Sequence, residues 1–111
     1  MPPETKSRIE HLLSSHRVVL FMKGTRALPQ CGFSAHVVDV LEEQSAEFYD
    51  VNVLDEPELR QGLKEYSAWP TFPQLYVDGQ LVGGCDIVSE LADSGEIAQL
   101  LAGEAKTPLS A

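Results

Sequence analysis

Cys31 is the residue of this chain best placed to do thiol chemistry. It opens the segment Cys31-Gly32-Phe33-Ser34, which has the C-x-x-C spacing of a redox motif with a serine in place of the second cysteine. The apolar pattern that follows predicts a helix, so Cys31 stands at a helix N-terminus. Unpaired backbone N–H groups and the helix dipole stabilise a thiolate there. We therefore predict a reactive thiol, although a lone cysteine is more commonly a small buried apolar residue.

The charge pattern around Cys31 supports this prediction. Residues 11–38 contain no acidic residue but include Arg17, Lys23 and Arg26, whereas the whole chain has 8 Lys and Arg against 17 Asp and Glu, for a formal charge of −9. An acidic surface repels phosphate backbones and anionic lipids, so we expect no nucleic-acid partner and no membrane partner. We interpret residues 11–38 as one basic region around Cys31 on an otherwise acidic protein.

The elements that must position Cys31 alternate between helices and strands. Apolar residues at helical spacing predict the helices, and short apolar or alternating runs predict the strands. Asp78-Gly79 between two apolar runs is a strong hairpin signal, so the last two strands are antiparallel. We expect a helix at 5–16, a strand buried on both faces at 18–22, a helix at 31–43, a half-buried or edge strand at 48–53, a helix capped by Asp55, a hairpin at 74–82, and a helix capped by Asp86 that breaks at Ser94-Gly95.

This order predicts one α/β domain with a mixed four-stranded sheet flanked by helices on both faces. The domain covers residues 1–111, with a core at about 5–102 and a flexible tail at 103–111. The longest apolar run, Val18 to Met22, is far shorter than the ~20 residues of a membrane span, and residues 1–6 do not read as a secretion signal. We expect a soluble, cytoplasmic protein.

Four motif blocks together resemble the monothiol glutaredoxins of the CGFS type. The blocks are Lys23-Gly24-Thr25 with Pro29, Cys31-Gly32-Phe33-Ser34, Trp69-Pro70-Thr71-Phe72-Pro73-Gln74-Leu75-Tyr76, and Gly83-Gly84-Cys85-Asp86. The resemblance covers roughly residues 5–101 and departs from the family's pattern at Arg26, where many members carry proline. It implies a thioredoxin-like fold with a cis peptide bond before Pro73.

The resemblance also implies a site for glutathione and for a 2Fe-2S cluster bridged between two protomers. Cys31 is implied as the catalytic thiol and the iron ligand. Lys23 and Arg60 would hold the glutathione carboxylates, Phe72 would offer backbone groups to the cysteinyl part, and Cys85 and Asp86 would meet the γ-glutamyl end. The residue chemistry agrees, because glutathione has two carboxylates and one ammonium and needs separated cations plus one carboxylate.

Plainer roles stay open for several of these residues. Lys23 and Arg60 are otherwise solvated surface charges, and Phe72 is otherwise a core aromatic. Cys85 is inert packing, a glutathione contact, or a disulfide partner of Cys31 if the two Cα atoms lie within ~7 Å.

The ligand count of a 2Fe-2S cluster favours a shared site, because such a cluster takes four ligands, usually thiolates. Two chains and two glutathiones supply them, so we expect a homodimer through the cluster and a monomer without it. We predict a role in iron–sulfur cluster storage and transfer and in iron and redox homeostasis. The resemblance implies a BolA-type partner and iron–sulfur acceptor proteins. The alternative is a glutathione-dependent oxidoreductase that reduces protein–glutathione mixed disulfides at Cys31, an activity that the resemblance implies is weak.

Overall fold

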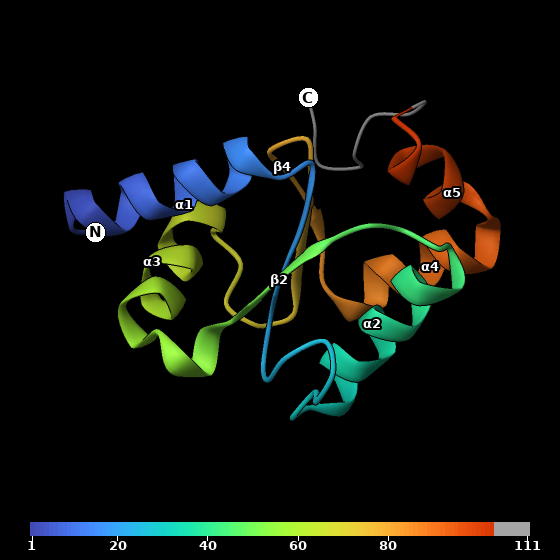
Figure 1. Cartoon of the computed structure of the whole chain (residues 1–111), viewed down its shortest axis with the longest axis horizontal. Coiled ribbons are helices and arrows are strands. Elements are labelled where there is room, and N and C mark those ends of the chain that lie inside the picture. Colours follow the sequence, from blue (N-terminus) through green and yellow to red (C-terminus); the bar gives the residue numbers. More distant parts are fainter. Residues whose placement is uncertain (104–111) are drawn as a thin grey trace.

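Helices and strands alternate along residues 1–103, the part of the chain that this computed structural model describes (Figure 1). The predicted flexible tail at 103–111 therefore lies, apart from Gly103, outside the described residues. The elements are α1 (Pro3–Ser15), β1 (Val18–Met22), α2 (Gly32–Glu43), β2 (Tyr49–Asn52), the 3-10 helix η1 (Val53–Asp55), α3 (Pro57–Ser67), β3 (Gln74–Val77), β4 (Gln80–Gly83), α4 (Cys85–Ser94) and α5 (Glu96–Leu101).

The strands form one mixed sheet in the order β2-β1-β3-β4. β1 runs parallel to β2 and antiparallel to β3, and β3 and β4 form an antiparallel hairpin. The turn residues Asp78 and Gly79 have φ values of +52° and +77°, as a two-residue turn with the right twist requires. The predicted hairpin, the edge strand and the mixed four-stranded sheet are confirmed.

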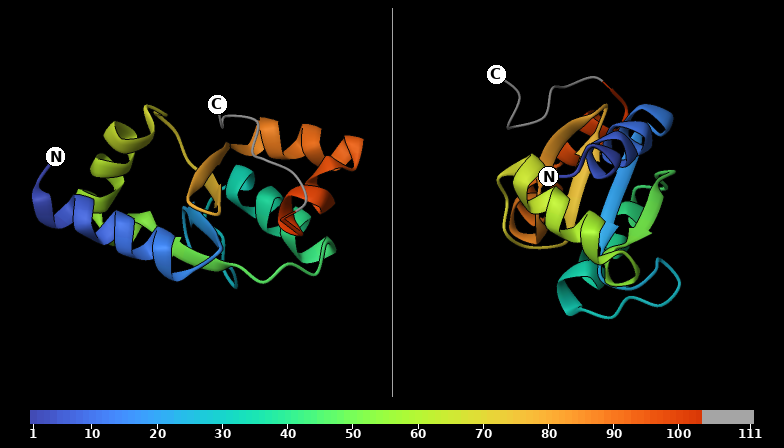
Figure 2. Two further views of the ribbon diagram at one scale, coloured as in Figure 1. Left: turned by 90° about the horizontal axis from the view of Figure 1, so that it is seen from above. Right: turned by 90° about the vertical axis from the view of Figure 1, so that its left-hand side faces the viewer.

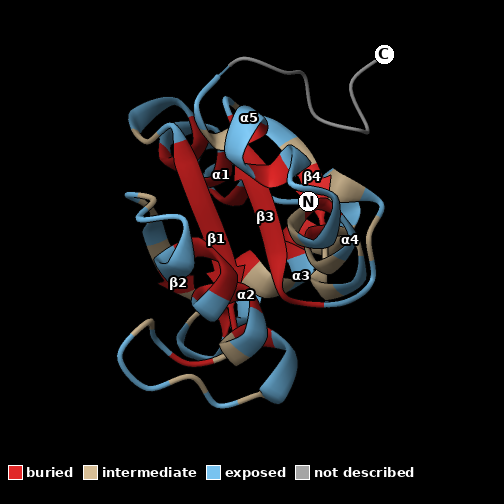
Figure 3. Ribbon diagram, turned by 90° about the vertical axis from the view of Figure 1, so that its right-hand side faces the viewer, coloured by how far each residue is buried: buried red, intermediate tan, exposed pale blue. Residues whose placement is uncertain are grey.

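Alternate residues of β1 face two different helical layers, as the prediction of a strand buried on both faces requires. Val19 and Phe21 belong to the core under α1 and α3. Val18, Leu20 and Met22 belong to the core under α2, α4 and α5. Figure 2 shows these two layers on either side of the sheet, and Figure 3 shows β1 and β3 as buried. None of the described helices is long and apolar enough to cross a membrane.

The predicted cap at Asp55 is wrong. Asp55 ends η1, and the residue that precedes the first turn of α3 is Glu56. The side chain of Asn52 accepts a hydrogen bond from the Leu54 N–H at 3.0 Å. This local bond stabilises an extra turn, η1, between β2 and α3. Because Asp55 is the last residue of that turn, it does not occupy the N-cap position of α3.

The predicted cap at Asp86 is also wrong by two residues. Gly84 is the N-cap of α4, and the helix already begins at Cys85. Asp86 therefore lies in the first helical turn, with an exposed side chain. A carboxylate in this position interacts favourably with the helix dipole, so the residue keeps an electrostatic role at the helix start without capping it.

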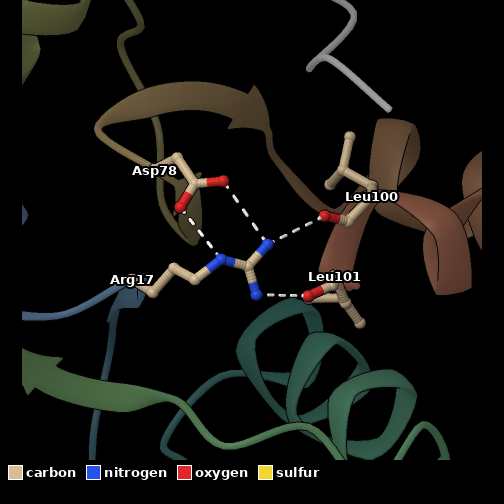
Figure 4. Close-up of polar contacts among 4 residues, drawn as sticks. All are labelled: Arg17, Asp78, Leu100 and Leu101. Atoms are coloured by element: carbon tan, nitrogen blue, oxygen red, sulfur yellow. Dashed lines mark hydrogen bonds and ion pairs between the residues drawn. The ribbon is translucent and has the colours of Figure 1, made fainter. Parts of the chain in front are cut away.

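Arg17 ties the hairpin turn to the end of α5 (Figure 4). Its Nε lies 2.9 Å from Oδ1 of Asp78, and its guanidinium also donates to the carbonyl oxygens of Leu100 and Leu101. Arg17 precedes β1, whereas Cys31 lies beyond the other end of that strand. Arg17 therefore does not belong to a basic region around Cys31, and that part of the interpretation is wrong.

Candidate functional site

Cys31 is the N-cap of α2, with φ −152° and ψ 135°. Its carbonyl oxygen accepts the first helical hydrogen bond, from the Ala35 N–H at 2.9 Å. The N–H groups of the preceding residues have no carbonyl within the helix to bond. Hydrogen bonds from the backbone N–H of Ser34 and then of Phe33 lower the pKa of the Cys31 thiol, the nearby Lys23 ammonium lowers it further, and partial burial opposes the shift. The predicted reactive thiol has the electrostatic environment that favours a thiolate.

Ser34 has a structural task at the position of the missing second cysteine. Its side chain is fully buried, and its Oγ accepts a hydrogen bond from the Lys23 N–H at 3.1 Å. This bond joins the first turn of α2 to the residue that follows β1. Ser34 therefore helps to hold Cys31 and Lys23 in a fixed relation.

A groove of about 550 Å³ lies beside Cys31, between the start of α2, residues 69–73 and the start of α4. Sites for small molecules typically have ~300–1,000 Å³. Every predicted site residue except Arg60 lines this groove: Lys23, Cys31, Phe72, Cys85 and Asp86. The two cysteines in it are both free thiols.

Arg60 lies on α3 and is not among the residues that line the groove. Its Nε is buried and has no hydrogen-bond partner among the described residues. Buried polar groups without a partner are uncommon and call for an explanation. The assignment of Arg60 to a carboxylate of glutathione stays a prediction.

Arg26 is held away from the groove. Its Nε lies 2.7 Å from Oε1 of Glu42, its guanidinium carbon lies 4.1 Å from the centre of the Phe48 ring, and its backbone N–H donates to Oδ2 of Asp50 at 2.9 Å. Of the three basic residues expected around Cys31, Lys23 alone lines the groove. The basic region is therefore a single lysine beside a helix N-terminus. The departure from proline at Arg26 gains a backbone donor that proline lacks.

Phe72 takes part in the core and in the groove at once. The Phe72–Pro73 peptide bond is cis, as expected. The Phe72 side chain is 6% exposed and packs in the core under α1 and α3. What Phe72 can offer to a ligand in the groove is therefore its backbone.

Three further residues line the groove without a role predicted from the sequence: Thr71 and Gly84, which belong to the motif blocks, and Ile87, which does not. For Gly84 a signal existed in the glycine pair before Cys85. A Cβ atom at Gly84 would lie 3.3 Å from Nε1 of Trp69 and 3.3 Å from the carbonyl oxygen of Pro73. Glycine thus lets the start of α4 approach residues 69–73 closely. Thr71 and Ile87 carried no signal beyond standing next to predicted residues.

The sequence of this chain is similar to a known family of proteins. The sequence model of the glutaredoxin family matches residues 18–82. An uncharacterised monothiol glutaredoxin of Synechocystis sp. is 52% identical over 101 residues, which cover 91% of this chain and 94% of that protein. A probable monothiol glutaredoxin 2 of Rickettsia typhi is 53% identical over 98 residues, 88% of each chain. The chloroplastic monothiol glutaredoxin-S14 of Arabidopsis thaliana is 54% identical over 99 residues, and the match spans 57% of its length.

Solved structures agree in fold. Reduced apo GrxS14 of poplar, solved in solution, has a TM-score of 0.79 and 54% identity, and the match covers 89% of this chain and 91% of the poplar chain. A buckwheat glutaredoxin crystallised as a glutathione complex has a TM-score of 0.79 at 22% identity, with 93% and 96% of the two chains covered.

Proposed function

Because this chain belongs to the glutaredoxin family, with relatives named monothiol glutaredoxins, we propose that it binds glutathione beside Cys31 and shares a 2Fe-2S cluster with a second copy of itself. The observation that carries the proposal is the Cys31 thiol. Its pKa is lowered at the N-terminus of α2, and it opens into a groove that also holds Lys23 and Asp86. The thioredoxin-like fold places the single thiol of the monothiol motif at the N-terminus of α2, beside the groove.

The groove fits a small molecule with the charges of glutathione. The Lys23 ammonium suits a carboxylate of the ligand, and the exposed Asp86 carboxylate suits its ammonium. Arg60 on α3 would supply a second cation for a carboxylate if the ligand extends beyond the groove toward α3. Glutathione is also the molecule bound in the buckwheat glutaredoxin complex.

The donor set fits a cluster held jointly by two protomers. A thiol with a lowered pKa is ready to bind iron as a thiolate. Among residues 1–103, no group of three or more His, Cys, Asp or Glu comes together to hold a metal ion. The remaining thiolate ligands would come from the partner's Cys31 and from two glutathione molecules. Ligands that diffuse away make the cluster labile cargo, which suits storage and transfer to iron–sulfur acceptor proteins, with a BolA-type protein as a further partner.

The same thiolate supports a second candidate function, the reduction of protein–glutathione mixed disulfides. The Cys31 thiolate attacks the glutathione sulfur, the substrate protein leaves as a thiolate, and Cys31 keeps the glutathionyl group. A second glutathione thiolate then attacks this disulfide, which restores the Cys31 thiolate and releases oxidised glutathione. Ser34 cannot do this internally, because it has no thiol and its Oγ is bonded to the Lys23 N–H. We rank this activity second and expect it to be weak.

Anaerobic reconstitution with iron and sulfide separates the two functions. We expect a coloured dimer by absorption and gel filtration when glutathione is present, and a colourless monomer when it is omitted. Cys31→Ser should abolish the colour, and the matched control Cys85→Ser should keep it. A chain that stays colourless and monomeric with glutathione while it rapidly reduces glutathionylated proteins would reverse the ranking.

We also propose that the protein works in the cytoplasm. Free thiols at Cys31 and Cys85 suit a reducing compartment, where disulfides are rare. Cell fractionation checks this, with recovery in the soluble cytoplasmic fraction expected. Recovery in an exported or membrane fraction would contradict it.

A further inference from the structure

Gln74 is a buried polar residue directly behind the groove. Its side chain is fully buried at the start of β3, on the side of the sheet covered by α1 and α3, where its neighbour Tyr76 also packs. Burying a side-chain amide lowers the stability of the fold unless its N–H donors and its oxygen acceptor are hydrogen-bonded. The function proposed above leaves this residue without a role.

The Gln74 amide is fully paired, and both of its donors go to the segment that lines the groove. Nε2 donates to the carbonyl oxygen of Trp69 at 3.1 Å and to that of Thr71 at 3.2 Å. Oε1 accepts from the hydroxyl of Tyr76 at 3.2 Å. Burial raises the pKa of Tyr76 to about 12, so its hydroxyl stays protonated and keeps the amide oxygen on its own side. The two N–H donors of Gln74 therefore face residues 69–71.

The bond to Thr71 fixes the direction of a neighbouring donor. The Thr71 carbonyl and the Phe72 N–H belong to one peptide unit, which is planar and trans. In such a unit the C=O and N–H point in opposite directions. Because the Thr71 carbonyl points inward to Gln74, the Phe72 N–H points the other way. No hydrogen bond within residues 1–103 engages that N–H, and Thr71 and Phe72 both line the groove.

We propose that Gln74 is a positioning residue for glutathione binding: its side-chain amide turns the Thr71–Phe72 peptide so that the Phe72 N–H faces the groove. There the N–H donates to the carbonyl of the cysteinyl residue of the ligand. Gln74 itself does not touch the ligand. This inference rests on the proposed glutathione site and deepens it, because it names the side chain that orients the Phe72 N–H toward the ligand.

A binding cycle tests the proposal. Glutathione is compared with an analogue whose Cys-Gly amide is replaced by an (E)-alkene, which keeps the shape but lacks both the carbonyl acceptor and the amide N–H; only the loss of the carbonyl depends on the Phe72 N–H. Titration calorimetry under reducing, anaerobic conditions gives the affinities of the wild-type chain and of Gln74→Met, a variant of similar length without the amide. The matched control is Gln80→Met, the same change at an exposed position of β4.

The wild-type chain should bind the alkene about tenfold more weakly than glutathione, the size of one hydrogen bond. Gln74→Met should bind glutathione about tenfold more weakly and show no further loss with the alkene. Gln80→Met should behave as wild type. An equal alkene penalty in wild type and Gln74→Met would overturn the positioning role and leave the glutathione site standing. If the wild-type chain bound neither ligand, the proposed function itself would fail.

A measurement on the wild-type chain keeps the proposal testable if Gln74→Met does not fold. In hydrogen exchange followed by NMR, the Phe72 amide should exchange fast in the free protein and slow down with glutathione. The side-chain amide protons of Gln74 should be protected in both states, because both are bonded and buried. A Phe72 amide already protected in the free protein would overturn the proposal.

Discussion

Replacing Arg17 by methionine should destabilise the fold more than breaking an ordinary surface ion pair. Arg17 binds Asp78 on the hairpin turn and the carbonyl oxygens of Leu100 and Leu101 at the end of α5 (Figure 4). The matched control is Arg8→Met. Arg8 pairs with Glu56 at 2.7 Å, with a side chain 46% exposed against 45% for Arg17. The two pairs differ in the carbonyl bonds, which Arg17 alone makes.

The expected cost follows from these contacts. An exposed ion pair contributes about 0–1 kcal/mol, and this is all that Arg8→Met should remove. Arg17 adds two hydrogen bonds to carbonyls, about 0.5 kcal/mol each at this exposure. A cation at a helix C-terminus adds about 0.3–1 kcal/mol. Arg17→Met should therefore lower the free energy of unfolding by about 1.3–3 kcal/mol, with Arg8→Met below about 1 kcal/mol.

Urea unfolding of both variants, and of Asp78→Asn, measures these differences. Asp78→Asn removes the ion pair and leaves the carbonyl bonds, so its cost should resemble that of Arg8→Met. In ~1 M salt the ion-pair and helix-dipole contributions should shrink, while the part of the excess that comes from the two carbonyl hydrogen bonds of Arg17 remains, because close hydrogen bonds are screened less than exposed charges. Equal costs for Arg17→Met and Arg8→Met would refute the reasoning.

Three further predictions concern single groups. Because backbone N–H groups lower the pKa of Cys31, iodoacetamide should alkylate Cys31 at pH 7 faster in the native protein than in the urea-unfolded protein. The rate of alkylation at Cys31 should fall as the pH drops through the lowered pKa. Equal rates at Cys31 in the native and unfolded protein would contradict this prediction. The pKa of Tyr76 is raised to about 12 from the usual value of about 10, so the stability it contributes is fully present below pH ~10 and is lost as the pH rises toward 12. An ultraviolet titration of wild type minus Tyr76→Phe should show its ionisation only near the upper end of that window, and ionisation near pH 10 would be evidence against it. A Cβ at Gly62 would collide with the Thr5 side chain, whereas at Gly32 it would meet nothing within 4 Å. Gly62→Ala should therefore cost about 1–3 kcal/mol and Gly32→Ala should stabilise the fold by up to about 1 kcal/mol; urea midpoints in the reverse order would show the packing argument to be wrong.

The fold was predictable because its signals are local. Val18 to Met22 reads as a strand buried on both faces, and Asp78-Gly79 supplies the backbone conformations of a tight hairpin turn. The helix starts were harder to predict. Side-chain bonds such as that from Leu54 to Asn52 compete with the helix at its start and move the cap by a residue or two.

Which residues line the groove could largely be predicted from the sequence, whereas which charged side chains lie near Cys31 could not. The motif blocks contain every residue of the groove except Ile87, but closeness along the chain grouped Arg17 and Arg26 with Cys31. In space, Arg17 binds the end of α5 and Arg26 binds Glu42. Charge patterns along a sequence do not reveal which cations are already paired, because the partners come from distant segments. The role we propose for Gln74 was hidden for a different reason. Its partners are close in sequence, but the role depends on the direction of a peptide unit, which the residue types do not reveal.

Native mass spectrometry of the anaerobically reconstituted protein tests the central claim most directly, because it counts the components of the complex. We expect a species with two chains, two glutathiones and one 2Fe-2S unit, which falls to apo monomers when glutathione is removed and does not form with Cys31→Ser. A cluster retained on a single chain, or on a dimer that contains no glutathione, would contradict the claim that Cys31 and glutathione together hold it.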